Sequence, residues 1–76
     1  MKTQKEIENC LASELSNMID EFKLDRLYEE SIVDYFTTFL LDAEVNPDII
    51  INVLQRKEFG QIGKDAAMGI KINLGY

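Results

Sequence analysis

The chain has 76 residues, a net charge of −6 and a hydrophobic content of 46%. This length allows one small domain, and this hydrophobic content is sufficient for a folded core rather than a disordered chain. The sequence has no histidine and one cysteine, which excludes an intrachain disulfide and removes the commonest general base and metal ligand. We therefore expect a non-enzymatic protein that needs no metal ion or cofactor.

The first helix is expected over residues 4–22. Thr3 and Glu6 match the T-x-x-E capping box that begins many helices. Apolar residues then recur every three or four positions, which places them on one face of a helix. They are Ile7, Leu11, Leu15, Met18, Ile19 and Phe22. Cys10 flanks this face, and we expect it to be a partly buried core residue rather than a reactive thiolate.

The segment LDRLYEE, at 24–30, has two interpretations. Either the first helix bends through it, or a loop ends at Ser31, which would form a second capping pair with Asp34. Apolar periodicity resumes after this point and predicts a second helix over 31–43. Its apolar residues are Ile32, Tyr35, Phe36, Phe39, Leu40 and Ala43. Five of the seven aromatic residues lie between positions 22 and 39, so we expect this region to supply the middle of the core.

Pro47 marks the strongest break in the chain, and a third helix is expected over 47–59. Proline is favoured at the first position of a helix, and Asn46 is suited to cap it. Gly60 is suited to end this helix. The apolar residues of the third helix cover about 200°, roughly twice the arc that one core-facing stripe requires. This helix must therefore be covered from two directions, by the C-terminal segment or by another subunit.

The C-terminal segment, residues 60–76, contains all four glycines and two overlapping apolar patterns. A repeat of four indicates a helix, whereas alternation near the end indicates a strand. The repeat of four is Ile62, Ala66, Ile70 and Leu74, and the alternating set is Ile70, Ile72, Leu74 and Tyr76. No other strand candidate exists, so we favour a short fourth helix over 62–73, with Ala66 and Gly69 allowing close approach to the third helix. The predicted fold is an all-α, three- to four-helix bundle in a single domain, 1–76.

Two short stretches resemble ligand-binding loops but lack necessary residues. In DAEVNPD, at 42–48, alternate positions carry possible calcium ligands, but Pro47 replaces the required glycine and Val53 replaces the bidentate glutamate. In GQIGK, at 60–64, the glycine–lysine pair has the wrong spacing for a phosphate-binding loop, and Asp65 replaces the hydroxyl residue. We expect helix capping and a solvated helix start at these positions.

Charge is distributed unevenly along the chain. Residues 1–48 contain twelve acidic and four basic residues, whereas residues 49–76 contain two acidic and four basic residues. An acidic surface repels nucleic acid and attracts basic partners. The leading hypothesis is a protein-binding module, an accessory subunit or an inhibitor, that docks on a basic protein surface. The expected partner-binding residues are Asp20, Glu21, Asp25, Glu29, Glu30 and Asp34.

The second hypothesis is a homo-oligomer that binds a small anionic ligand. The third helix and the glycine-containing segment would form the subunit contact, and Lys64 or Lys71 would meet the ligand between chains. The expected contact residues are Ile49, Ile50, Ile51, Val53 and Leu54. The first residues contain no apolar signal-peptide segment, and no apolar run is long enough to span a bilayer, so a cytoplasmic location is expected.

Overall fold

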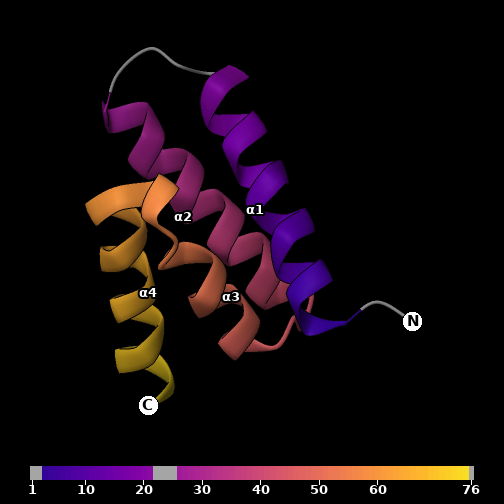
Figure 1. The fold of residues 1–76 in the computed structure, drawn as a ribbon. Helices are drawn as coiled ribbons and strands as arrows, with labels where there is room; N and C mark the ends of the chain where they lie inside the picture. Colours follow the sequence, from indigo (N-terminus) through magenta and orange to yellow (C-terminus); the bar gives the residue numbers. More distant parts are fainter. Residues whose placement is uncertain (1–2, 22–25, 76) are drawn as a thin grey trace.

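The computed structural model describes residues 3–21 and 26–75 of the chain. These residues form an all-α globule of four helices without strands, as predicted. The elements are α1 (Gln4–Glu21), α2 (Arg26–Asp42), α3 (Pro47–Leu54), the single-turn 3-10 helix η1 (Lys57–Phe59) and α4 (Gly60–Leu74). Consecutive α-helices run in opposite directions, and α1 and α4 lie on opposite sides of α2 and α3 (Figure 1).

The core lies between the helices, with α3 at its centre. Ile50, Val53 and Leu54 of α3 are completely buried because α1 packs on one side of α3 and α4 packs on another. The remaining buried apolar residues are Ala12, Leu15, Val33, Phe36, Leu40, Ile51, Phe59, Ala67 and Ile70. Full burial of a large aliphatic side chain contributes roughly 1.5–3 kcal/mol to stability. The second cover that the apolar surface of α3 requires is therefore α4 of the same chain.

Helix α1 has the predicted start. The Oγ1 atom of Thr3 accepts a hydrogen bond from the backbone N–H of Glu6 at 3.2 Å, and the Thr3 hydroxyl donates to the Glu6 carboxylate at 3.4 Å. The helix is described as far as Glu21, and the predicted last residue, 22, lies outside the described residues. Cys10 is exposed, so the expectation that it is partly buried is wrong.

Helix α2, Arg26–Asp42, is already helical at Arg26, five residues before the predicted start at 31. Ser31 lies inside the helix, so its predicted role as a cap is wrong. Glu29 lies in the first described turn, where an acidic side chain interacts favourably with the helix dipole. Glu21 and Glu29 belong to two separate helices, α1 and α2.

The turn between α2 and α3 lies in the stretch whose alternate polar residues resemble a calcium loop. The N–H groups of Glu44 and Val45 donate to the carbonyl groups of Leu41 and Leu40, both at 3.1 Å, which forms a Schellman cap. Glu44 has a φ of 61°, a left-handed conformation that is normally taken by glycine. Asn46 Oδ1 then accepts from the N–H of Asp48 at 2.9 Å, which confirms the predicted cap of the next helix.

Helix α3 ends at Leu54, five residues before the predicted end at 59. Arg56 has an extended backbone, with ψ of 148°, and the chain turns there into η1. This turn places Phe59 in the core. Gly60, with a φ of 57°, then reverses the chain into α4, so this glycine ends η1 rather than α3.

Helix α4 confirms the helical interpretation of the C-terminal segment. It packs tightly on α3 at Gly63, where an added Cβ atom would overlap the carbonyl oxygen of Leu54. An added Cβ at Gly69 would have no neighbour within 4 Å, so the predicted role of this glycine in packing on α3 is wrong. The face of α4 turned towards the core carries Gly63, Ala67 and Ile70, whereas Gly69 is turned towards α2.

Candidate functional site

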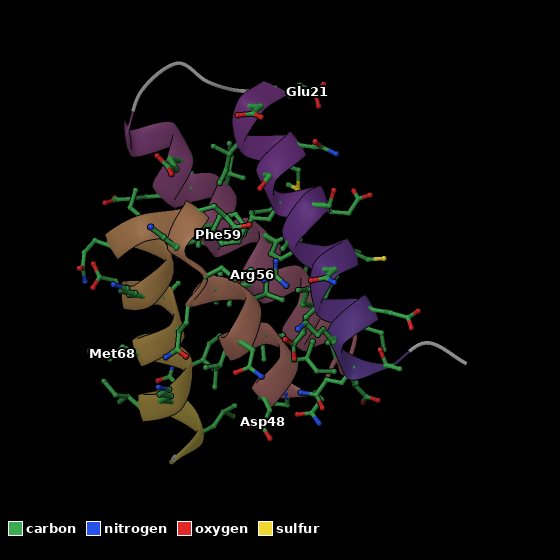
Figure 2. All side chains as sticks on the ribbon, viewed as in Figure 1. Glu21, Asp48, Arg56, Phe59 and Met68 are labelled. Carbon is green, nitrogen blue, oxygen red and sulfur yellow. The ribbon has the colours of Figure 1, made fainter. Side chains whose placement is uncertain are left out.

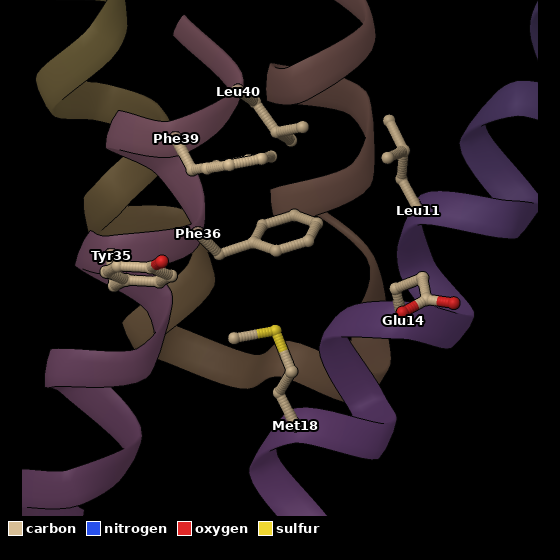
Figure 3. Close-up of a pocket in the computed structure, with 7 residues that line it drawn as sticks. All are labelled: Leu11, Glu14, Met18, Tyr35, Phe36, Phe39 and Leu40. Carbon is tan, nitrogen blue, oxygen red and sulfur yellow. The ribbon is translucent and has the colours of Figure 1, made fainter. Parts of the chain in front are cut away.

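An open apolar groove of about 260 Å³ lies between α1 and α2. It is lined by Leu11, Glu14, Met18, Tyr35, Phe36, Phe39 and Leu40 (Figure 3). Six of these seven side chains are apolar or aromatic. An apolar depression of this kind on a small protein is typical of an interaction site.

Two exposed aromatic rings form one wall of the groove. Tyr35 and Phe39 are one helical turn apart on α2, and their rings are stacked with centroids separated by 6.4 Å. The side chains are 64% and 59% exposed, respectively. The expectation that these two aromatic residues belong to the middle of the core is therefore wrong. Phe36 and Leu40, which form the floor of the groove, are buried as expected.

The width of the apolar arc on α2 explains why Tyr35 and Phe39 are exposed while Phe36 and Leu40 are buried. Tyr35 lies 100° from Phe36 around a helix, so both cannot point at the centre of the same core. Helix α4 packs against the other flank of α2, and no described element covers the flank with Tyr35 and Phe39. The sequence contained this signal, because the apolar residues of the second predicted helix span more than one core-facing stripe.

The opposite wall of the groove belongs to α1. Leu11 and Met18 are two turns apart and both are half-buried, with Glu14 between them. Figure 3 shows Met18 extending from α1 towards Phe36. A methionine side chain is unbranched and polarisable, and it adapts to different apolar partners. The groove thus combines a rigid aromatic wall with an adaptable wall that carries one carboxylate.

The acidic residues predicted to bind a partner occupy two different places. Asp20 and Glu21 are exposed at the end of α1, while Glu30 and Asp34 are exposed in the first half of α2. Glu29 is half-buried in the first turn of α2, and Asp25 lies outside the described residues. The end of α1 and the start of α2 lie at the same end of the molecule (Figure 1).

Glu30 and Asp34 face α4 rather than the apolar groove. They line a second open depression, of about 330 Å³, together with Asp65. The other lining residues are Ile62, Ala66 and Gly69. Asp65 was not predicted to join the acidic residues of α2, because only the packing of α4 on α2 brings these side chains together.

Glu8 differs from the other carboxylates because it joins α1 to α3. Its carboxylate accepts hydrogen bonds from Gln4 Nε2 at 2.9 Å and from Asn52 Nδ2 at 3.2 Å. These two hydrogen bonds, with a smaller contribution from the charge of Arg56, lower the pKa of Glu8 below its usual value. Arg56 also donates to Asn9 Oδ1 on α1. We therefore assign Glu8 to the α1–α3 contact and not to a partner-binding surface.

The residues predicted to form a subunit contact are mostly enclosed by their own chain. Ile50, Ile51, Val53 and Leu54 are at most 5% exposed, which leaves them no surface for a second subunit, and Ile49 is half-buried. The predicted anion contacts, Lys64 and Lys71, lie on α4, where Lys64 is exposed and Lys71 is half-buried. The oligomer contact predicted on the third helix is thus replaced by the intrachain packing of α4.

Among residues 3–21 and 26–75, no three cysteine, aspartate or glutamate side chains are grouped so as to hold a metal ion. Within the same ranges, no helix has the length and apolar character needed to cross a membrane. Comparison of the chain with family models, curated proteins and solved structures finds no match. The class of protein is accordingly defined by the fold and the surface alone: an acidic, four-helix globule with an exposed aromatic groove.

Proposed function

We propose that this chain is a protein-binding module whose groove between α1 and α2 binds an amphipathic helix with apolar side chains and flanking lysine or arginine residues. The observation that carries this proposal is the exposed, stacked pair of Tyr35 and Phe39 beside the groove. The module would act by binding, as an accessory subunit or an inhibitor of the protein that contains the helix.

Apolar burial provides the first part of the recognition. A partner helix presents apolar residues at positions i, i+4 and i+7 along one face, and such a face fits a groove between two helices. Tyrosine and phenylalanine at the centre of an interface typically supply a large share of the binding energy. The binding free energy that each ring can add is limited by the area that it still exposes to water. More than half of Tyr35 and of Phe39 is exposed here.

Charge provides the second part of the recognition. Helices α1 and α2 together carry nine acidic and two basic residues, and Glu14 lies in the wall of the groove. A partner with lysine or arginine beside its apolar stripe would approach this surface faster and in a preferred orientation. The same charge disfavours nucleic acid, whose affinity for proteins depends on neutralising phosphates with basic residues.

Binding of a model peptide tests this proposal. The probe is a fluorescein-labelled helix of leucine and lysine, about 18 residues or five turns long, and the matched control replaces every lysine with glutamate. We expect the lysine peptide to bind in a titration followed by fluorescence anisotropy and the glutamate peptide not to bind. Because the interaction includes exposed charges, the affinity for the lysine peptide should fall as salt is added.

Variants on two faces of α2 locate the binding surface. Phe39→Ser should weaken binding of the lysine peptide by about tenfold or more, which corresponds to about 1.4 kcal/mol. Leu41→Ser is the control, because Leu41 is an exposed apolar residue of the same helix that does not line the groove. Equal binding of the two peptides, or equal losses from the two substitutions, would contradict the proposal.

The surface carboxylates make a separate prediction within this proposal. Replacing Glu29, Glu30 and Asp34 with their amides should slow association of the lysine peptide and reduce its salt dependence. The dissociation rate should change less, because none of these three residues lines the groove. A stopped-flow measurement in which the association rate is unchanged would show that these carboxylates have no part in binding.

A small anionic ligand at Lys64 or Lys71 is the weaker alternative, since Asp65 adjoins Lys64 and would repel an anion.

A further inference from the structure

We infer that one occupant of the groove is α4 of a second copy of this chain, so that the protein self-associates head to tail. This inference rests on the proposed function, because it names a helix with the chemistry that the groove would bind. Such a contact joins two different surfaces, the groove of one copy and the outer face of α4 in the next.

The outer face of α4 carries the features expected of the partner helix. Met68 and Ile72 are one turn apart and are 58% and 72% exposed. Lys64 and Lys71 complete a set spaced i, i+4, i+7 and i+8, which lies on one face of a helix. Figure 2 shows Met68 at the side of α4 that is directed away from the other helices. This face is an exposed apolar stripe of Met68 and Ile72, with Lys64 exposed and Lys71 half-buried beside it.

Charge complementarity argues for a second copy as the occupant. Helix α4 has two lysines and one aspartate, whereas α1 and α2 together have nine acidic and two basic residues. The basic stripe of one copy would therefore meet an acidic surface on the next. The net charge of −6 on each whole chain opposes association, so we expect weak binding that partner peptides displace.

The arrangement of the helices determines the kind of assembly. Helix α4 packs on α2 and α3, on the side of the molecule opposite to α1 (Figure 1). One chain cannot place its own α4 in its own groove without losing this packing. Joining two different surfaces produces a heterologous contact, which extends into a chain of subunits or closes into a ring.

Complementation between two variants tests the inference. The groove variant is Tyr35→Ser with Phe39→Ser, and the α4 variant is Met68→Ser with Ile72→Ser; all four side chains are more than half exposed. In sedimentation velocity, the wild-type chain should associate as its concentration rises, while each variant alone should remain monomeric. A mixture of the two variants should form a one-to-one dimer that does not grow, because it contains one intact groove and one intact α4 face.

Charge substitutions test the same contact without removing apolar side chains. The variant Lys64→Glu with Lys71→Glu should self-associate about tenfold or more weakly than the wild type. Mixing it with a second chain that carries Glu14→Lys in its groove should restore part of the lost affinity. Circular dichroism of each variant verifies that the helices are retained. These substitutions keep the inference testable if a serine variant does not fold.

The results separate this inference from the proposed function. A wild-type chain that stays monomeric at all concentrations but binds the leucine–lysine peptide overturns only the self-association. Association that persists in both double-serine variants, or variants whose mixture stays monomeric, also overturns it. Failure to bind the peptide would instead count against the groove itself.

Discussion

Gly63 determines how closely α4 packs against the rest of the core. A Cβ atom at this position would overlap the carbonyl oxygen of Leu54 and lie 2.7 Å from the Cβ atom of Phe59. Non-bonded carbon atoms are most stable about 3.5–4.0 Å apart. Neither neighbour can rotate away, because one belongs to the backbone and the other is attached directly to it. Gly63→Ala therefore requires α4 to move away from α3 and η1.

Two opposing terms set the size of the effect. Overpacking a core typically costs about 1–3 kcal/mol, while replacing glycine with alanine inside a helix gains up to about 1 kcal/mol. We expect Gly63→Ala to destabilise the protein by about 1–2 kcal/mol, a large part of the roughly 3–5 kcal/mol available to a domain of this size. The corresponding decrease in Tm is about 4–8 °C per kcal/mol.

Gly69→Ala is the matched control in the same helix. An added Cβ there would meet no other part of the described chain within 4 Å beyond the local helix backbone, so only the gain in helix propensity remains. We expect this substitution to stabilise the protein by about 0.5–1 kcal/mol. Urea and thermal unfolding followed by circular dichroism measure both variants. Stabilisation by both substitutions would refute the contact described between α4 and Leu54.

Three further predictions concern other local features of the fold. Glu44→Gly should stabilise the protein by about 1 kcal/mol in urea unfolding, since Glu44 has a left-handed backbone with a φ of 61°; a loss of stability would contradict the Schellman cap. Thr37→Val should stabilise it by about 1 kcal/mol in the same assay, because Thr37 is 9% exposed and its buried Oγ1 atom has no hydrogen-bond partner; destabilisation would indicate that the hydroxyl is satisfied. The lowered pKa of Glu8 predicts a contribution to stability that is present above the ordinary value of 4.5 and lost as the pH falls through the folded-state value. Unfolding measured over a pH series should therefore show a smaller acid-induced loss for Glu8→Gln than for the wild type, and identical slopes would contradict this role.

The sequence predicted the helical fold because each helix has an apolar stripe and two of the starts have local caps. Thr3 and Asn46 act through residues two or three positions away, so their patterns alone located the starts of α1 and α3. The early end of α3 was not predicted. The chain leaves the helix at Arg56, which has an extended backbone and whose side chain contacts Asn9 on α1. Arg56 and Asn9 are far apart in the sequence, so local apolar periodicity does not reveal this contact.

The candidate site was predicted only in part. The acidic character of the first two helices was evident from composition, but the groove depends on which flank of α2 remains uncovered. Glu30 and Asp34 were predicted to act with Asp20 and Glu21, and instead they face α4 beside Asp65. The packing of α4 on α2 separates Glu30 and Asp34 from Asp20 and Glu21. The spacing of residues within α2 does not reveal this packing.

The overlapping helix and strand patterns of α4 also have a physical explanation. Ile70 is buried, whereas Ile72 is 72% exposed and contributes to the alternating pattern without joining the core. An apolar residue on the outer face of a helix disturbs the periodicity expected from burial alone. The same residue is the most exposed large apolar side chain in the described chain and belongs to the α4 face inferred to bind a second copy.

Chemical-shift mapping with the leucine–lysine peptide tests most directly whether a partner helix enters the groove between α1 and α2. The ¹H–¹⁵N spectrum of the labelled protein would be recorded during a peptide titration, with the methyl group of Met18 as an additional probe. We predict that the largest changes occur at Leu11, Met18, Tyr35 and Phe39. Largest changes at Asp34 and Asp65 would contradict the proposed binding site.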